Sequence, residues 1–129
     1  MESLFLGDVA AGFPSPAESY SEAPLDLNQL LVRRPAATFF VRVTGDSMTG
    51  ASIQDGDILV VDRSLRARNG SVVIACVNGD FTVKYFRIDT DGAPWLVPAN
   101  PRYPAVPLGD GSEGQLFGVV TAVIHQFRS

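Results

Sequence analysis

Two residues in this sequence, Ser47 and Lys84, could together carry out covalent catalysis. Ser47 lies in Gly45-Asp46-Ser47-Met48, where a glycine-preceded turn would expose a nucleophile close to backbone N–H groups that can stabilise an oxyanion. Lys84 lies in the apolar strand segment Phe81-Thr82-Val83-Lys84, where burial would lower its pKa. A neutral lysine amine can take the serine proton while the serine oxygen attacks a peptide carbonyl. The pair therefore predicts peptidase chemistry with serine as nucleophile and lysine as base.

Each of the two residues also has a purely structural interpretation. Most serines at strand ends cap a turn, and most strand lysines extend to water from an edge strand. A lysine that acts as a base near neutral pH needs a pKa about 3 units below its usual value, at a cost of ~4 kcal/mol. The packing of the folded protein would have to supply that free energy.

Other catalytic chemistries have weaker support. A Ser-His-Asp triad could use only His125, which lies in the last predicted strand and is expected to be a surface or structural residue. Cys76 is the single cysteine, so no intrachain disulfide can form, and we expect a buried small hydrophobic residue. Without a ligand cluster, no metal or other cofactor is expected. The acidic residues of the turns and strand ends are expected to be solvated, namely Asp55, Asp57, Asp62, Asp89 and Asp91.

The N-terminal arm contains small residues that a peptidase site could cut, in Val9-Ala10-Ala11-Gly12-Phe13-Pro14. Prolines bias the arm toward extended conformations, and a cleft usually binds extended peptide as an added strand. The segment before Gly12 has no Lys or Arg and no long apolar run. A secretory signal is therefore not expected.

Composition and charge limit the class of protein. With 129 residues, of which 46% are hydrophobic, the chain is expected to fold around one core. A net charge of −4 gives little support for direct sequence-specific DNA binding, which needs a clustered basic face. No apolar run approaches the ~20 residues of a membrane span, so no membrane association is expected. Together with the single cysteine, these features are consistent with a cytoplasmic protein.

Segments of β-branched and aromatic residues, separated by turn residues, predict a mainly β fold from Thr38 onward. Asn78-Gly79 predicts a tight hairpin, because this pair tolerates positive φ at both central positions. Before the strands, residues 26–31 predict a short helix capped by Asp26. The predicted strands are 38–43, 58–61, 71–77, 81–88, 95–98 and 116–127.

Several segments resemble the LexA-like Ser/Lys autopeptidases, and in particular the UmuD branch of that family. The Gly-Asp-Ser-Met segment is shared across the family, whereas Gly12-Phe13-Pro14-Ser15-Pro16-Ala17 is more particular to the UmuD branch. The other matching segments are Leu25-Asp26-Leu27-Asn28-Gln29-Leu30-Leu31, Phe81-Thr82-Val83-Lys84 and Val97-Pro98-Ala99-Asn100-Pro101-Arg102-Tyr103. The resemblance covers nearly the whole chain from Gly12.

The resemblance implies a role for each matching site residue. Ser47 would be the nucleophile and Lys84 the general base. The backbone amides of Asp46 and Ser47 would form the oxyanion hole, and Ala11–Gly12 would be the scissile bond.

For the whole protein, the resemblance implies an extended arm, residues 1–24, that carries the cleavage site, followed by a peptidase domain, residues 25–129. The domain would be a small, strongly bent antiparallel β structure with one or two short helical turns, and would form homodimers. RecA filaments on single-stranded DNA would stimulate self-cleavage in the SOS response. The trimmed dimer would then serve as the accessory subunit of an error-prone translesion DNA polymerase, beside a UmuC-like catalytic subunit.

Three other functions fit the sequence less well than self-cleavage. A LexA-type repressor would need two helices with a basic face before the Gly-Asp-Ser-Met turn, and that pattern is missing. A type I signal peptidase also uses serine and lysine, but it would need a membrane anchor. The remaining alternative is a non-catalytic, dimeric interaction subunit of the polymerase, in which the pair of Ser47 and Lys84 is vestigial.

Overall fold

The computed structural model describes residues 2–4, 8–13, 24–109 and 114–127. The chain divides into two compact units, Met1–Arg33 and Arg34–Ser129, which are described separately. Part of the predicted arm, residues 14–23, lies outside the described residues. No helix in the described part of the chain is long and apolar enough to cross a membrane.

The first unit contains the short helix that the sequence predicts. Helix α1 (Leu27–Leu31) begins after Asp26, whose side chain accepts a hydrogen bond from the Asn28 backbone N–H at 3.0 Å. This bond satisfies one of the amides that every helix start leaves without a partner. Ahead of the helix, β1 (Glu2–Leu4) pairs antiparallel with β2 (Pro24–Asp26), a pairing that the sequence analysis missed.

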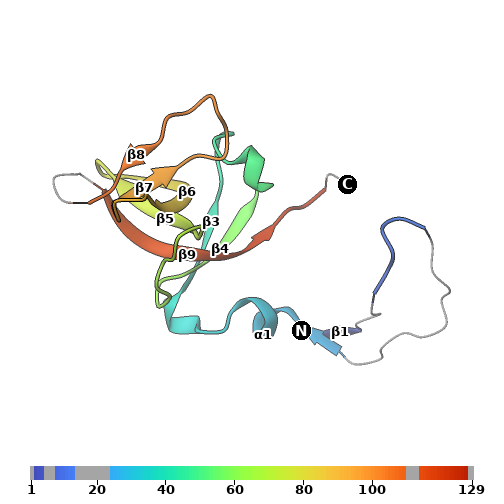
Figure 1. The fold of residues 1–129 in the computed structure, drawn as a ribbon. Coiled ribbons are helices and arrows are strands. Elements are labelled where there is room, and N and C mark those ends of the chain that lie inside the picture. Colours follow the sequence, from blue (N-terminus) through green and yellow to red (C-terminus); the bar gives the residue numbers. More distant parts are fainter. Residues whose placement is uncertain (1, 5–7, 14–23, 110–113, 128–129) are drawn as a thin grey trace. The chain divides into compact units, whose positions relative to one another are not determined.

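The second unit is built on one antiparallel sheet of seven strands in the order β3-β4-β9-β5-β6-β7-β8 (Figure 1). The predicted mainly β class is confirmed, and only the short β8 was not predicted. The 3-10 turns η1 (Pro35–Ala37) and η2 (Thr49–Ala51) flank the first strand. The strands are β3 (Thr38–Arg42), β4 (Ile58–Asp62), β5 (Val72–Val77), β6 (Asp80–Ile88), β7 (Pro94–Val97), β8 (Val106–Pro107) and β9 (Gly114–Ile124).

The hairpin between β5 and β6 confirms the prediction from Asn-Gly. Asn78 has φ +52° and Gly79 has φ +86°, as a two-residue turn of this kind requires. A two-residue turn sets the register of the strands that it joins. In that register Lys84 of β6 lies opposite Val73 of β5.

Strand β9 joins the two parts of the sheet. Its first half pairs with β5 and its second half with β4, and the register shifts between Ile74 and Ala75 and between Val60 and Val61. Such irregularities bend a strand and increase its twist. Figure 1 shows β9 as a long curved strand, in agreement with the bent β structure that the resemblance implies.

The bent sheet buries both faces of β5. Alternate side chains of a strand point to opposite faces, so Ile74 belongs to one core cluster while Val73 and Ala75 belong to another. Met48, the residue after Ser47, is 1% exposed and packs in the first cluster. The other members of that cluster are Val43, Ile53, Leu59, Val61 and Ile74.

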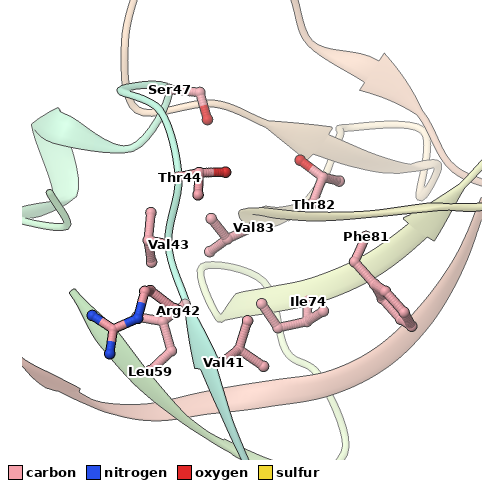
Figure 2. A pocket seen from close by; sticks show the side chains of 10 residues that line it. All are labelled: Val41, Arg42, Val43, Thr44, Ser47, Leu59, Ile74, Phe81, Thr82 and Val83. Atoms are coloured by element: carbon pink, nitrogen blue, oxygen red, sulfur yellow. The ribbon is translucent and has the colours of Figure 1, made fainter. Parts of the chain in front are cut away.

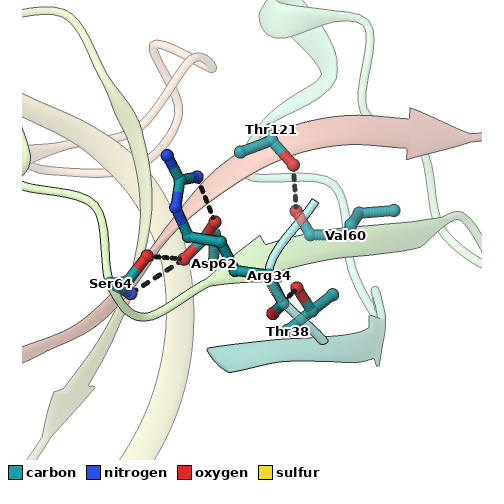
Figure 3. A network of polar contacts seen from close by, with 6 residues as sticks. All are labelled: Arg34, Thr38, Val60, Asp62, Ser64 and Thr121. Carbon is teal, nitrogen blue, oxygen red and sulfur yellow. Dashed lines mark hydrogen bonds and ion pairs between the residues drawn. The ribbon is translucent and has the colours of Figure 1, made fainter. Parts of the chain in front are cut away.

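The prediction that the acidic residues of the turns and strand ends are solvated is wrong for two of them. Asp57 and Asp62 are only 2% and 4% exposed. Asp62, at the end of β4, accepts hydrogen bonds from the backbone N–H and hydroxyl of Ser64 and from Arg34 (Figure 3). The Ser64 hydroxyl is the main cause that lowers the pKa of Asp62, against the opposing effect of burial. Position at a strand end did not reveal the Arg34 donor, because Arg34 lies 28 positions away in the sequence.

Candidate active site

Ser47 lies in the turn that follows β3, and three features shape this turn. Gly45 has φ +94°, a conformation that favours glycine, and its N–H donates to Asp55 Oδ1 at 2.8 Å. Met48 is buried in the core, and η2 follows it directly. The turn therefore holds Ser47 between a fixed glycine and an anchored methionine.

Lys84 lies in β6, just before the stretch Tyr85–Ile88 that pairs with β7, and its side chain is half-buried instead of extending fully to water. Its Nζ lies 3.0 Å from Ser47 Oγ, 2.8 Å from Thr82 Oγ1 and 3.1 Å from the Val83 carbonyl oxygen. The structure therefore brings the two predicted residues into direct hydrogen-bond contact.

Burial lowers the pKa of Lys84. The side chain is half-buried, and in the described part of the chain no carboxylate forms an ion pair with it. Its oxygen partners are two hydroxyls and a carbonyl, which carry no net charge. Desolvation without a counter-ion favours the neutral amine over the ammonium.

The three oxygens around Lys84 fit the hydrogen-bonding capacity of a neutral amine, which has two N–H groups and one lone pair. The Val83 carbonyl can only accept, so it takes one N–H. The Thr82 hydroxyl can accept the second N–H. The lone pair then faces the Ser47 hydroxyl, which can donate its proton to Lys84.

A pocket of about 170 Å³ lies beside Ser47. Figure 2 shows Ser47, Thr44 and Thr82 toward one end of it, with Val41 and Leu59 toward the other. A small pocket with both apolar and polar lining, next to a hydroxyl, suits a small side chain of a bound peptide. The pocket is lined by Val41, Arg42, Val43, Thr44, Ser47, Leu59, Ile74, Phe81, Thr82 and Val83.

The segment after β7 contacts the Ser47 turn directly. The Ala99 N–H donates to the Ser47 carbonyl oxygen at 2.9 Å, and the Ala99 carbonyl accepts from the Gly50 N–H at 2.7 Å. A Cβ at Gly50 would lie 2.3 Å from the Ala99 oxygen, so this close approach requires glycine. The segment thus fixes the backbone on both sides of Met48.

Sequence analysis gave no role to three residues that contact the site. Thr82 contacts Lys84, and the signal for it was available because alternation places both side chains on one face of β6. Asn100 Nδ2 donates to the Asp46 carbonyl at 3.0 Å, and the Tyr103 hydroxyl donates to Asp46 Oδ1 at 2.5 Å. The Asp46 carboxylate raises the pKa of Tyr103, which keeps this donor protonated. No local pattern indicates the last two contacts.

His125 and Cys76 take no part in the contact between Ser47 and Lys84. His125 Nδ1 lies 2.5 Å from Asp57 Oδ1, which supports the structural role that we expect for this histidine. The backbone N–H of Gln54, and then His125, lower the pKa of Asp57 in spite of its burial. Cys76 is half-buried, not buried as predicted, because β5 leaves the core after Ala75 and approaches the exposed hairpin turn.

Two further parts of the predicted site are described in the structure. The backbone amides of Asp46 and Ser47 donate hydrogen bonds to none of the described residues, so both are available to a substrate oxygen. Ala11 and Gly12 lie in the first unit and are exposed. Their assignments as oxyanion donors and scissile bond stay predictions.

Known proteins resemble this chain over most of its length. The family model described as Peptidase S24-like matches residues 3–121. Protein SamA of Salmonella typhimurium strain LT2 is 49% identical over 98% of this chain and 86% of its own length. Protein MucA of Salmonella typhimurium is 46% identical over 92% of this chain and 80% of its own length. Protein ImpA of Salmonella typhimurium is 44% identical over 97% of this chain and 84% of its own length.

These matches agree with the antiparallel sheet of the second unit. They confirm the resemblance to the UmuD branch of the LexA-like peptidases that the sequence motifs indicate. By the family match over residues 3–121, this chain belongs to the Peptidase S24-like family.

Proposed function

We propose that this protein is a serine endopeptidase that cuts its own Ala11–Gly12 bond, with Ser47 as nucleophile and Lys84 as general base. The observation that carries the proposal is the 3.0 Å contact between Ser47 Oγ and Lys84 Nζ, in a half-buried site where no described carboxylate pairs with the lysine. Membership of a peptidase family supports the reaction class.

The first step forms an acyl-enzyme. Neutral Lys84 takes the Ser47 proton as Ser47 Oγ attacks the Ala11 carbonyl carbon. The amides of Asp46 and Ser47 stabilise the negative oxygen of the tetrahedral intermediate. When the C–N bond breaks, the Lys84 ammonium gives its proton to the Gly12 nitrogen, and an ester joins Ser47 to Ala11.

The second step releases the short N-terminal peptide. Lys84, neutral again, removes a proton from a water molecule, and the resulting hydroxide attacks the ester carbonyl. The bond from Ser47 Oγ to the Ala11 carbon breaks, and Ser47 regains its proton from Lys84. The released Ala11 carboxylic acid loses its proton to solvent, so the products are a peptide that ends in the Ala11 carboxylate and a chain that begins at Gly12.

We also propose that the cut protein acts in SOS mutagenesis, as a homodimeric accessory subunit of an error-prone polymerase with a UmuC-like catalytic subunit. RecA filaments on single-stranded DNA would stimulate the cut. The support is the similarity to proteins SamA, MucA and ImpA over most of the chain, together with the UmuD-like segments of the sequence.

Intact mass measured during incubation from neutral to alkaline pH tests the peptidase function, with Ser47→Ala and Lys84→Ala in parallel. The wild type should lose residues 1–11, whereas both variants should stay whole while keeping the folded circular-dichroism spectrum. A second series adds RecA, single-stranded DNA and ATP, which should accelerate the loss in the wild type alone.

Loss of the same peptide from Ser47→Ala would exclude Ser47 as the nucleophile. A wild type that stays whole in both series would favour the non-catalytic interaction subunit.

A further inference from the structure

We propose that Asn100 is a positioning residue for the peptidase reaction, because it holds the Asp46–Ser47 peptide group so that the Ser47 N–H faces the substrate oxyanion. The inference rests on the proposed function and adds a residue to its site. Asn100 lies in the segment between β7 and β8 and makes no direct contact with either Ser47 Oγ or the Lys84 amine among the described residues.

The orientation of the Asn100 amide follows from its two partners. Its Oδ1 accepts the backbone N–H of Arg102 at 3.0 Å, and this partner can only donate. Its Nδ2 donates to the carbonyl oxygen of Asp46 at 3.0 Å, and this partner can only accept. A flipped amide would lose both hydrogen bonds, so the donor must face Asp46.

A peptide group is planar, which transmits the effect of Asn100 to the Ser47 amide. The Asp46 carbonyl and the Ser47 N–H belong to one such group, and no cis peptide bond is present in the described residues. In a trans group the C=O and N–H point in opposite directions. Holding the Asp46 oxygen therefore aims the Ser47 N–H away from Asn100, toward the side on which no described acceptor takes it.

One other contact on this turn acts on the same peptide group, since the Thr49 N–H also donates to the Asp46 carbonyl, at the longer distance of 3.3 Å. The remaining contacts act on neighbouring groups. The Tyr103 hydroxyl holds the Asp46 side chain, and the Ala99 N–H holds the carbonyl of Ser47, which belongs to the next peptide group. Among the described residues, Asn100 therefore makes the shorter of the two hydrogen bonds that hold the peptide group between Asp46 and Ser47, and it is the one made by a side chain. The half-buried position of Asn100 limits competition from water for this hydrogen bond.

Because Asn100 makes two hydrogen bonds, a substitution that removes one and keeps the other can test positioning apart from a merely structural role. Asn100→Asp keeps Oδ1 as an acceptor for Arg102, so the turn after β7 is retained. It replaces the Nδ2 donor by a second acceptor that faces the Asp46 oxygen. If Asn100 only shaped the turn, this variant would cut itself like the wild type.

The experiment compares self-cleavage of the full-length wild type, Asn100→Asp and Asn69→Asp by intact mass, as rate against pH. Asn69 is a matched control, because its Oδ1 accepts the Ile88 N–H and the change adds the same charge at an exposed site. Plateau rates at alkaline pH are compared, where Lys84 is neutral in every variant. We expect Asn100→Asp to lower the plateau by about tenfold or more, since loss of an oxyanion donor costs 10²–10³-fold. Asn69→Asp should keep the wild-type plateau, and thermal unfolding should show all three proteins folded.

A wild type that cuts itself and an Asn100→Asp variant with the same plateau would overturn the positioning role alone. A plateau lowered equally by Asn69→Asp would also overturn it, since the added charge would then be the cause. A wild type that stays whole, with or without RecA filaments, would overturn the proposed function and this inference with it.

Discussion

At the scale of single residues, the partners of two basic side chains show why Lys84 is suited to proton transfer. Arg34 binds the buried carboxylate of Asp62, which stabilises its positive charge. Lys84 instead contacts two hydroxyls and a carbonyl, and burial lowers its pKa. A cation without a counter-ion gains from losing its proton, so the Lys84 site favours the basic form that the reaction needs.

Self-cleavage is expected to quicken as pH rises and then to level off below the ordinary pKa of lysine. Burial lowers the pKa of Lys84, so the neutral amine forms at lower pH than for a free lysine. Well below that pKa the rate should rise about tenfold per pH unit, because the neutral fraction does so. Intact mass against time at each pH gives the profile. A rate that still climbs at about pH 10.4, the ordinary value, would contradict the lowered pKa.

Thr82→Val is expected to slow self-cleavage about five- to tenfold without unfolding the protein. The change keeps the shape of the side chain but removes the oxygen that lies 2.8 Å from Lys84 Nζ. One such hydrogen bond contributes on the order of 1 kcal/mol, and its loss lets the amine turn away from Ser47. The matched control is Thr82→Ser, which keeps a hydroxyl and should stay within about twofold of the wild type. Equal rates for the valine and serine variants would exclude an orienting role for Thr82.

At the scale of elements, β9 decides how the sheet closes around its core. It pairs with both β4 and β5, and Gly118 lies in the stretch where its pairing passes from one to the other. A Cβ at Gly118 would lie 2.7 Å from Val61 Cγ1 and 3.3 Å from the Asp62 carbonyl oxygen. The absence of a side chain therefore lets β9 approach the end of β4, which carries the buried Asp62.

Gly118→Ala is expected to lower the free energy of unfolding by about 1–3 kcal/mol, the usual cost of overpacking a well-filled core. Urea denaturation measures the change. Val61→Ala provides the matched background, because it removes the Cγ1 atom that the new methyl group would meet. The cost of Gly118→Ala should be smaller in that background. Additive costs would show that the contact with Val61 is not the cause.

At the scale of the whole molecule, the proposed substrate bond and the proposed catalytic residues belong to different units of one chain. Ala11 and Gly12 are exposed, and a Cβ built on Gly12 meets no atom within 4 Å. Substitutions at Gly12 should therefore leave both units folded. Their effect on cleavage reports how the bond is recognised by the Ser47 site.

Gly12→Glu is expected to block self-cleavage, while Gly12→Ala should be cut at a rate within about tenfold of the wild type. The glutamate would bring a bulky charge next to the attacked carbonyl, and removing a charge from water on binding is costly. Intact mass over the incubation series measures both variants. Unchanged cutting of Gly12→Glu would move the scissile bond away from Ala11–Gly12, and mass analysis of the products would locate it.

Features that depend on neighbours in the chain were determined by the sequence alone. The Asp26 cap and the Asn78-Gly79 hairpin follow from backbone preferences of single residues and pairs. The main strands follow from runs of β-branched and aromatic side chains. Ser47 and Lys84 were recognised from residue type and from family motifs, so their candidacy needed no coordinates.

Features that depend on residues far apart in the chain were decided only by the tertiary structure. Asp62 is buried and accepts a hydrogen bond from Arg34, which lies 28 positions away, although its position at a strand end predicts a solvated side chain. Asn100 contacts Asp46 although four strands separate β3 from β7 in the sheet order, because the sheet is bent and Ala99 joins the segment after β7 to the turn after β3 by backbone hydrogen bonds. Local patterns report the conformation of a segment and which of its faces is apolar. They carry no information about which distant segments meet, since that is set by strand pairing and packing of the whole sheet.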